Sequence, residues 1–126
     1  MKTLIVSAAL SILTVAVPTA AVAQDAAAGK KVFRRCMACH TVDEGGANKV
    51  GPNLWGIFGS TAGSRANGFN YSKALKDSGI VWDDTTLSAY LENPRKAVPK
   101  TRMSFAGLKK AEQRHDVIAY LKSVTQ

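Results

Sequence analysis

The stretch that decides the fold is RRCMACHTVDEGG, residues 34–46. It holds both cysteines of the 126-residue chain, Cys36 and Cys39, and one of its two histidines, His40. Thiolates and imidazoles are the side chains that bind soft metals and form covalent links most readily. Because all three lie within five consecutive positions, they indicate a single shared site.

The spacing Cys36-x-x-Cys39-His40 is the attachment signal of c-type haem. Two thiols three positions apart at the end of a helix can both reach the vinyl groups on one porphyrin edge. An imidazole at the next position then coordinates the iron from the proximal side. We therefore expect one haem c, with thioether links to Cys36 and Cys39 and with His40 as an iron ligand.

Three other interpretations of the two cysteines are weaker. A disulfide between them would close a very short loop and would add little stability. A thioredoxin-like redox pair belongs to a βαβ pattern, which the sequence lacks. A structural zinc ion needs four nitrogen or sulfur ligands, and only His115 remains to complete the set. A haem stain that survives a denaturing gel would separate covalent haem from all three.

The first 23 residues resemble a secretory signal peptide. Lys2 provides a positive start, residues 4–17 are apolar or small, Pro18 interrupts them, and residues 21–23 read Ala-Val-Ala. We expect cleavage after Ala23, which leaves residues 24–126 as a single domain. The alternative is an uncleaved membrane anchor, because the segment just reaches the roughly 20 residues needed to span a bilayer.

The charge of the chain is strongly positive. It has 17 Lys and Arg against nine Asp and Glu, a formal net charge of +8. Such a surface attracts acidic partners, and an exported protein meets acidic proteins or anionic lipid rather than nucleic acid. The mature domain is also short for a large core, so a bound apolar cofactor would help it to fold.

Apolar periodicity and capping residues predict an all-α domain with long loops. The predicted helices cover residues 25–35, 72–78, 83–93 and about 110–124. Either Asp83 or Asp84 caps the third helix, and Pro94 stops it. Residues 40–71 are rich in Gly, Pro and Asn, and a compact domain tolerates so long a loop when it wraps something.

A second axial ligand would close the iron to substrates. Met1 leaves with the signal peptide and Met37 lies between the two cysteines, so Met103 and His115 remain. The apolar stripe predicted for the last helix consists of Val117, Leu121 and Val124, with Ile118 and Tyr120 on its flanks. His115 falls opposite this stripe and is expected to be a solvated surface residue. Met103 lies in an irregular segment, and by itself it would be ordinary core filler. With the haem motif present, Met103 is the preferred ligand.

A histidine and methionine pair favours reversible electron transfer. The soft, neutral thioether favours Fe(II) and raises the reduction potential relative to a second histidine. Because both axial positions are filled, little reorganisation accompanies the change of oxidation state. This arrangement suits one-electron transfer and disfavours turnover of a substrate at the iron.

Several motifs in fixed order resemble class I cytochrome c, close to the mitochondrial protein and its soluble bacterial counterparts. They are CMACHTVDEGG, GPNLWGIFG, GFNYSKALKDSGIVW, LSAYLENPRKAVPKTRMSFAGLKK and DVIAYLK. The resemblance covers about residue 29 to the C-terminus. It implies four or five helices enclosing one haem, with the N-terminal helix crossing the C-terminal one. Gly29 would allow their close approach, with Phe33, Tyr120 and Leu121 nearby.

The resemblance also implies roles for individual residues. His40 and Met103 would be the axial ligands, and the carbonyl of Pro52 would accept a hydrogen bond from the free ring nitrogen of His40. Four further positions are implied near the haem: Tyr71 and Trp82 as propionate partners, and Tyr90 and Thr101 as polar groups on the methionine side. Phe105 would lie beside the haem edge. Without the resemblance, each aromatic residue would be assigned to ordinary core packing.

Seven basic residues match family positions around the exposed haem edge. They are Lys31, Arg35, Lys49, Arg95, Arg102, Lys109 and Lys110. A run of charge is usually a solvated face, but these residues come from distant parts of the sequence. The hypothesis is a docking ring that steers encounters with acidic partner surfaces.

Three positions and the length of one loop depart from the mitochondrial pattern. Leu75 replaces an asparagine that helps to hold an internal water, and Lys100 replaces the glycine before Thr-x-Met. Ser60 stands where an arginine often contacts a propionate, and Arg65, in a loop one residue longer, is a candidate substitute. These changes bear on the reduction potential and the propionate contacts.

The expected function is that of a soluble, monomeric, periplasmic electron carrier that is not an enzyme and is not inserted in the membrane after cleavage. It would take electrons from a membrane quinol-oxidising cytochrome complex or a periplasmic dehydrogenase. It would pass them to a terminal oxidase of a respiratory chain, a photosynthetic reaction centre or a peroxidase. The alternatives are an open-haem, peroxidase-like enzyme or gas sensor, and a dedicated subunit of one dehydrogenase.

Overall fold

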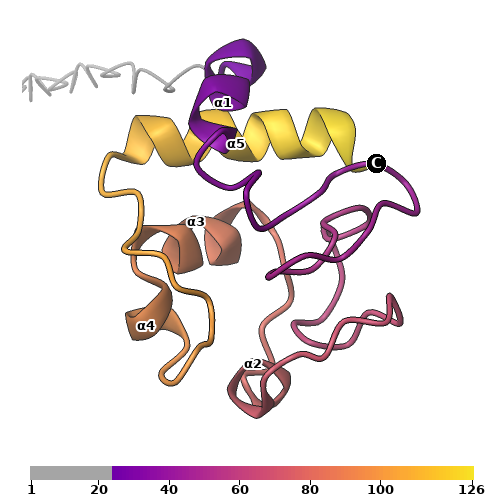
Figure 1. The fold of residues 1–126 in the computed structure, drawn as a ribbon. Coiled ribbons are helices and arrows are strands. Elements are labelled where there is room, and N and C mark those ends of the chain that lie inside the picture. The colour runs from indigo at the N-terminus through magenta and orange to yellow at the C-terminus, as the bar shows by residue number, and fades with distance from the viewer. Residues whose placement is uncertain (1–23) are drawn as a thin grey trace, which may run out of the picture.

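A computed structural model of the chain describes residues 24–126. The predicted signal peptide lies outside the described residues. The described part contains five helices: α1 (Ala26–Phe33), α2 (Lys73–Asp77), α3 (Asp84–Glu92), α4 (Pro94–Ala97) and α5 (Ala111–Val124). Its only β-structure is an isolated bridge between Thr61 and Val81, so the predicted all-α class is confirmed (Figure 1). None of these helices is long and apolar enough to cross a membrane.

The first three helices each begin after a residue whose side chain caps them, and for α2 and α3 this residue is one that the sequence predicted. The Asp25 carboxylate accepts hydrogen bonds from the backbone N–H groups of Ala27 and Ala28, which starts α1. The Ser72 hydroxyl accepts from Leu75 N and starts α2. Asp83, rather than Asp84, caps α3 through a reciprocal pair of hydrogen bonds with its third residue.

Pro94 both ends α3 and begins a helix that was not predicted. The sequence indicated an irregular segment after Pro94, but residues 94–97 form α4. The side chain of Asn93 accepts a hydrogen bond from Lys96 N, and Pro94 takes the first helical position. A proline suits that position, because its missing N–H would have no partner there and its φ angle is already helical.

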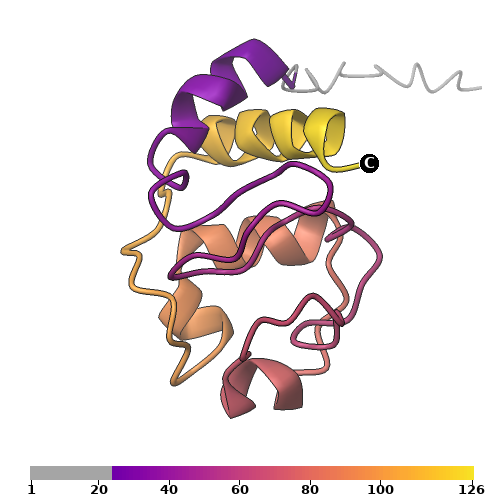
Figure 2. The same ribbon diagram turned by 45° about the vertical axis from the view of Figure 1, so that its right-hand side comes forward.

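The first and last helices cross in direct contact, as predicted. Figures 1 and 2 show α1 lying across α5 at one end of the molecule. A Cβ atom at Gly29 would lie 1.9 Å from the backbone oxygen of Asp116, so only glycine allows this approach. Next to the crossing, the rings of Phe33 and Tyr120 pack with their centroids 5.3 Å apart.

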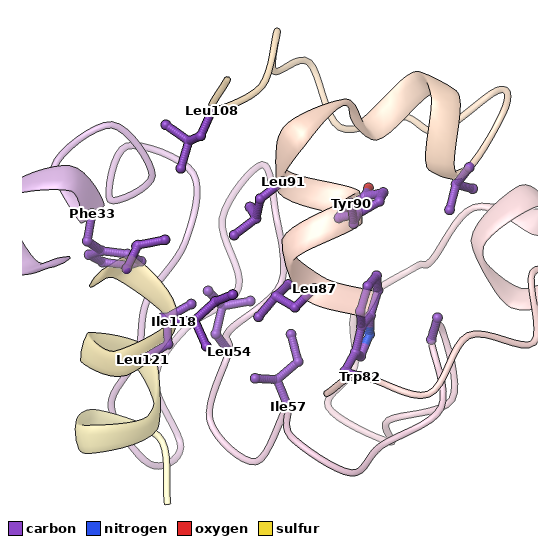
Figure 3. Close-up of a cluster of buried hydrophobic side chains, with 13 residues drawn as sticks. Phe33, Leu54, Ile57, Trp82, Leu87, Tyr90, Leu91, Leu108, Ile118 and Leu121 are labelled. Carbon is purple, nitrogen blue, oxygen red and sulfur yellow. The ribbon is translucent and has the colours of Figure 1, made fainter. Parts of the chain in front are cut away.

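The core lies between α3, α5 and the loop segments that face them (Figure 3). It has 13 buried members: Phe33, Leu54, Ile57, Ala62, Trp82, Leu87, Tyr90, Leu91, Val98, Leu108, Val117, Ile118 and Leu121. The stripe predicted for α5 is shifted by a small rotation. Ile118, expected on its flank, is 1% exposed, whereas Val124, expected in the stripe, is only half-buried.

The long loop over residues 40–71 is tied to the segment that precedes α3. The N–H of Ala62 donates to Ile80 O at 2.7 Å, and that of Gly59 donates to Trp82 O at 2.8 Å. Trp82 N in turn donates to Ser60 O at 2.9 Å. These three hydrogen bonds hold the loop against the segment before α3 without forming a sheet. They also fix the backbone of Trp82 beside the loop.

Candidate haem-binding site

The two cysteines follow α1 in a series of tight turns. Cys36 N donates to Phe33 O at 2.7 Å, and both Cys39 N and His40 N donate to Cys36 O at 3.0 Å. This continuation of α1 brings two free, half-buried thiols and the imidazole onto one short segment. Burial raises the pKa of the Cys36 thiol, and the charge of Arg35 opposes that shift.

The His40 ring is fixed by the backbone of the following loop. Its Nδ1 lies 2.7 Å from the carbonyl oxygen of Pro52 and donates to it in the neutral tautomer that suits a metal ligand. Within the described residues Nε2 makes no hydrogen bond. Burial lowers the pKa of His40, and the Pro52 bond partly opposes that effect. The ring is therefore held neutral, with one nitrogen lone pair available.

Gly51 provides the space in which this ring lies. A Cβ atom at residue 51 would be 2.4 Å from Cε1 of His40 and 2.8 Å from both ring nitrogens. Real Cβ atoms do not approach so closely, so any side chain would displace the imidazole. The role of Gly51 was not singled out from the sequence, where it stands only as the first residue of the Gly-Pro-Asn-Leu motif.

A buried asparagine holds the Pro52 loop in shape. Asn53 is 6% exposed, and its Nδ2 donates to Thr41 Oγ1 and to Asp43 O, both at 2.8 Å. Its backbone N–H donates to Asn48 Oδ1 at 2.8 Å, and its Oδ1 accepts from Trp55 N at 3.0 Å. Since the whole side chain is satisfied, the carbonyl of Pro52 has a defined position. Sequence reasoning missed this residue, and its only signal was a turn-forming Pro-Asn pair.

Arg65 reaches back to the same loop. Its guanidinium donates to Trp55 O at 2.7 Å and to Asn53 O at 2.8 Å. Arg65 also contributes to the lowered pKa of His40, which places its positive charge near the imidazole. Ser60, at the position where the family often has arginine, uses its hydroxyl to donate to Ile57 O at 2.6 Å.

The segment that carries Met103 is anchored by a tyrosine and a threonine. Tyr90 OH lies 2.8 Å from Thr101 Oγ1, and Met103 N donates to that same oxygen at 3.3 Å. Burial raises the pKa of Tyr90, and the bond to Thr101 opposes the shift, so the phenol stays protonated. The half-buried Met103 packs against the core cluster that Cys36 also borders.

Lys100, just before this anchor, has an unusual backbone. Its φ is +66°, and it is the only non-glycine residue with a positive φ among residues 24–126. A side chain in the left-handed region costs about 1–2 kcal/mol. The resemblance to class I cytochrome c implies a glycine at this position, and the positive φ gives the physical reason.

Tyr71, Trp82 and Phe105 also border the apolar interior. Tyr71 is 7% exposed, and its hydroxyl accepts from Asn67 Nδ2 at 2.8 Å. The ring of Trp82 packs on that of Tyr90 with centroids 5.2 Å apart. Phe105 packs against the core cluster, and the guanidinium of Arg35 lies 5.4 Å from the centroid of its ring.

The seven residues of the predicted docking ring are all exposed. None of them takes part in a salt bridge within the described residues. Three of them donate instead to backbone carbonyls: Lys49 to Met37 O at 3.0 Å, Lys109 to Glu92 O at 2.8 Å, and Arg102 to Asn70 O. Their charges are thus free to act on a partner.

His115 differs from its prediction. It is half-buried, and it lines a surface hollow together with Gln24, Asp84 and Glu92. The helical wheel treats the far side of α5 as solvent, but α3 and the start of the chain approach that side. His115 lies on α5 outside the cysteine segment and the Met103 loop, so it is not part of this site.

The donor set as a whole fits a c-type haem. Two free thiols, a neutral imidazole with one available nitrogen and a thioether are the groups that such a cofactor requires. A glycine leaves space beside the imidazole, and the apolar cluster supplies the low-polarity surroundings.

Comparisons with known proteins agree with this site. Residues 26–125 match the family Cytochrome c. A cytochrome c2 of Afifella marina is 56% identical over 100 residues, which cover 77% of this chain and 80% of that protein. A cytochrome c of Chlamydomonas reinhardtii is 51% identical over 104 residues, 82% of this chain and 92% of that one. The solved structure of cytochrome cH from Methylobacterium extorquens superposes with a TM-score of 0.74 and 46% identity, covering 79% of this chain and 98% of that chain.

Proposed function

The chain belongs to the cytochrome c family, and from this premise we propose that it is a periplasmic shuttle between membrane-bound redox complexes. Members of the family are small electron carriers with one covalently attached haem c. The proposal adds the compartment, the partners and the roles of individual residues.

We assign the haem to four side chains. Cys36 and Cys39 would form the thioether links, and His40 and Met103 would be the axial ligands. When bound, the haem supplies an iron that gains or loses one electron reversibly. The observation that carries this assignment is the donor set, in which the ring of His40 is fixed by Pro52 and keeps one nitrogen available.

The surrounding residues would keep both ligands in place through the redox cycle. The bond from His40 Nδ1 to Pro52 O raises the basicity of the imidazole and fixes its orientation. The Tyr90–Thr101 pair would hold the Met103 segment, while Tyr71 and Trp82 would meet the propionates. The buried apolar cluster excludes water, which reduces the solvent reorganisation that accompanies each transfer.

The docking ring would guide encounters with partners. Its seven exposed cations lack salt-bridge partners in the described chain, which supports a role in steering toward acidic surfaces. Donors would be a quinol-oxidising cytochrome complex or a periplasmic dehydrogenase, and acceptors a terminal oxidase or a photosynthetic reaction centre. Export to the periplasm rests on the predicted signal peptide and on the bacterial relatives.

Replacement of the axial methionine tests the carrier against an open-haem enzyme or gas sensor. Met103→Ala is expected to lower the reduction potential, produce a high-spin spectrum and permit carbon monoxide binding. Met37→Ala is the matched control, because it removes a thioether that is 53% exposed and should change none of these. If the wild-type protein already binds carbon monoxide rapidly, the open-haem function replaces the proposal.

Electron transfer at varied ionic strength tests the docking ring. The rate with solubilised membranes should fall as salt rises, because exposed charges are screened within about 8–10 Å at 0.10–0.15 M salt. Arg95→Gln should lower the rate at low salt. Lys73→Gln, which removes a cation already paired with Asp77, should not. Equal rates for wild type and both variants at every salt concentration would exclude the ring.

A further inference from the structure

The hydroxyl group of Tyr71 is part of a buried residue and has one hydrogen-bond partner. Tyr71 is 7% exposed, and its oxygen accepts a hydrogen bond from Asn67 Nδ2 at 2.8 Å. A phenol can accept one hydrogen bond and donate another at the same time. Within the described residues the hydroxyl proton has no acceptor of its own. This donor is therefore available to a group that the protein encloses.

The orientation of the Asn67 side chain is fixed by its second polar atom. Its Oδ1 accepts from the backbone N–H of Phe69 at 3.2 Å, so the amide cannot turn over without losing this bond. Nδ2 must then face Tyr71, and an amide nitrogen can only donate. Because Asn67 cannot accept the Tyr71 proton, that proton has to point elsewhere.

A second asparagine holds the backbone of Asn67. Asn48 Nδ2 donates to Asn67 O at 2.8 Å. The Oδ1 atom of Asn48 accepts from Asn53 N at 2.8 Å, so this amide is oriented as well. Asn53 directly follows Pro52, whose carbonyl fixes the imidazole of the site. The loop that orients the imidazole is thus hydrogen-bonded to the residue that orients the Tyr71 hydroxyl.

The ring of Tyr71 is also fixed in place. The ring of Phe69 meets it edge-on with centroids 5.1 Å apart, and Tyr71 N donates to Phe69 O at 3.1 Å. From the segment that carries Met103, Arg102 donates to Asn70 O, directly before Tyr71. With the ring held, the remaining freedom of the hydroxyl is rotation of its O–H bond. The contact with Asn67 restricts this rotation.

We propose that Asn67 is a positioning residue, which directs the hydroxyl proton of Tyr71 away from the loop and toward a haem propionate. The inference rests on the proposed function, in which Tyr71 meets a propionate, and it adds the residue that sets the direction of that bond. A hydrogen bond donated to a propionate offsets part of its negative charge. The propionate then stabilises the oxidised iron less, so a correctly directed Tyr71 raises the reduction potential.

Asn67→Asp tests the direction of the proton with little change in shape. The new carboxylate oxygen would replace Nδ2, which lies 2.8 Å from the Tyr71 oxygen. A carboxylate can only accept, so the Tyr71 proton would turn to it and leave the propionate. The reduction potential of the holoprotein should fall in a redox titration. We expect the equilibrium constant for reduction to decrease about twofold or more, as for neighbours in one hydrogen-bond network.

Two controls separate the direction of the proton from the added negative charge, which lowers the potential by itself. Asn70→Asp adds the same charge three positions away, on an exposed residue that is not the partner of the Tyr71 hydroxyl. Tyr71→Phe removes the hydroxyl. The effect of Asn67→Asp should exceed that of Asn70→Asp in the wild-type background. In the Tyr71→Phe background it should shrink to the effect of charge alone.

The outcomes distinguish this inference from the proposed function. If Tyr71→Phe leaves the potential unchanged, Tyr71 does not meet a propionate, and its proposed role fails together with the inference. If Tyr71→Phe lowers the potential but Asn67→Asp has the same effect in both backgrounds, the inference alone is overturned.

Asn67→Ala decides if Asn67→Asp fails to fold around the haem. Alanine leaves the O–H bond free to rotate, so the potential should fall in the wild-type background. In the Tyr71→Phe background it should stay unchanged, because no hydroxyl remains to be directed. Equal effects in the two backgrounds would again overturn the inference.

Discussion

The Nδ1 atom of His40 lies 2.7 Å from the carbonyl oxygen of Pro52, which fixes both the tautomer and the direction of the imidazole. The two residues are 12 positions apart, and the loop between them closes through the buried side chain of Asn53. A metal ligand with its second nitrogen bonded in this way is a stronger electron donor than a free imidazole.

Gly51→Ala should disturb this relationship directly. The new methyl group would lie 2.4 Å from Cε1 of His40, so the ring or the loop must move and the bond to Pro52 must lengthen. A less basic imidazole stabilises Fe(III) less, so the reduction potential measured by redox titration should rise. Overpacking should also lower the free energy of unfolding by about 1–3 kcal/mol.

Gly45→Ala is the control for that substitution. Gly45 has a φ of +67° and no atom within 4 Å of its added Cβ, so it carries backbone strain without a steric clash. Its potential should match that of the wild type. An unchanged potential in both variants would mean that the space beside His40 does not constrain the ring.

Gly29→Ala should destabilise the crossing of α1 and α5. Its Cβ would lie 1.9 Å from Asp116 O and 2.9 Å from Tyr120 Cβ, so the helices must separate. Helix propensity alone would favour alanine by about 1 kcal/mol, yet we expect a net loss of about 1–3 kcal/mol in denaturant unfolding. Ala27→Gly, at an exposed site of the same helix, measures the propensity contribution separately. A more stable Gly29→Ala protein would refute the close contact.

Lys100→Gly should stabilise the protein. The φ of +66° at Lys100 strains any side chain, while glycine adopts it freely. Glycine also has more conformational entropy in the unfolded chain, and this entropy reduces the gain. The free energy of unfolding, measured with denaturant, is therefore expected to rise by a net amount of about 0.5–1 kcal/mol. Lys96→Gly, in the helical backbone of α4, should instead lose about that amount. Destabilisation by both changes would show that residue 100 is not strained.

Asp83 should contribute to the loss of stability in acid. The backbone N–H of Thr86, and then its hydroxyl, hold the pKa of Asp83 below its usual range. A carboxylate with a lowered folded pKa stabilises above its unfolded value of about 3.9, and that contribution is lost as pH falls through the folded pKa. Asp83→Asn should therefore flatten the decline of Tm below about pH 4.

Glu44→Gln is the matched control for the acid limb, because it removes an exposed carboxylate that lies outside the helices. Its Tm should follow the wild-type curve. If Tm declined in the same way below about pH 4 in Asp83→Asn and in Glu44→Gln, the capping box would not be the source of the pH dependence.

Features set by neighbouring residues were predictable from the sequence. Asp25, Ser72 and Asp83 each cap a helix through an N–H two or three positions ahead, and such local signals do not depend on the rest of the fold. The cysteine and histidine motif is local in the same sense. The helix that starts at Pro94 was also locally encoded, by Asn93 before a proline, but the proline was interpreted only as a stop.

Features that depend on distant partners were not predictable. Val98 and Leu108 are 2% and 1% exposed although both lie outside regular structure, because Leu108 N bonds to Leu91 O and the segment folds over α3. Arg65 donates to backbone carbonyls 10 and 12 positions away, and no periodic pattern in the sequence predicts such contacts. The burial of Asp116 depends in the same way on a distant partner, because its carboxylate accepts from Asp25 N at the start of α1.

The crossing of α1 and α5 has a consequence for synthesis. The ring of Phe33 can pack on Tyr120, and Gly56 N can donate to the carbonyl of the buried Thr125, only after the ribosome has translated α5 and the residue that follows it. A nascent or translocating polypeptide therefore cannot close around its own N-terminal segment. The crossing therefore cannot cover Cys36 and Cys39 before α5 has been made, and attachment of the haem to an open chain would be compatible with this order.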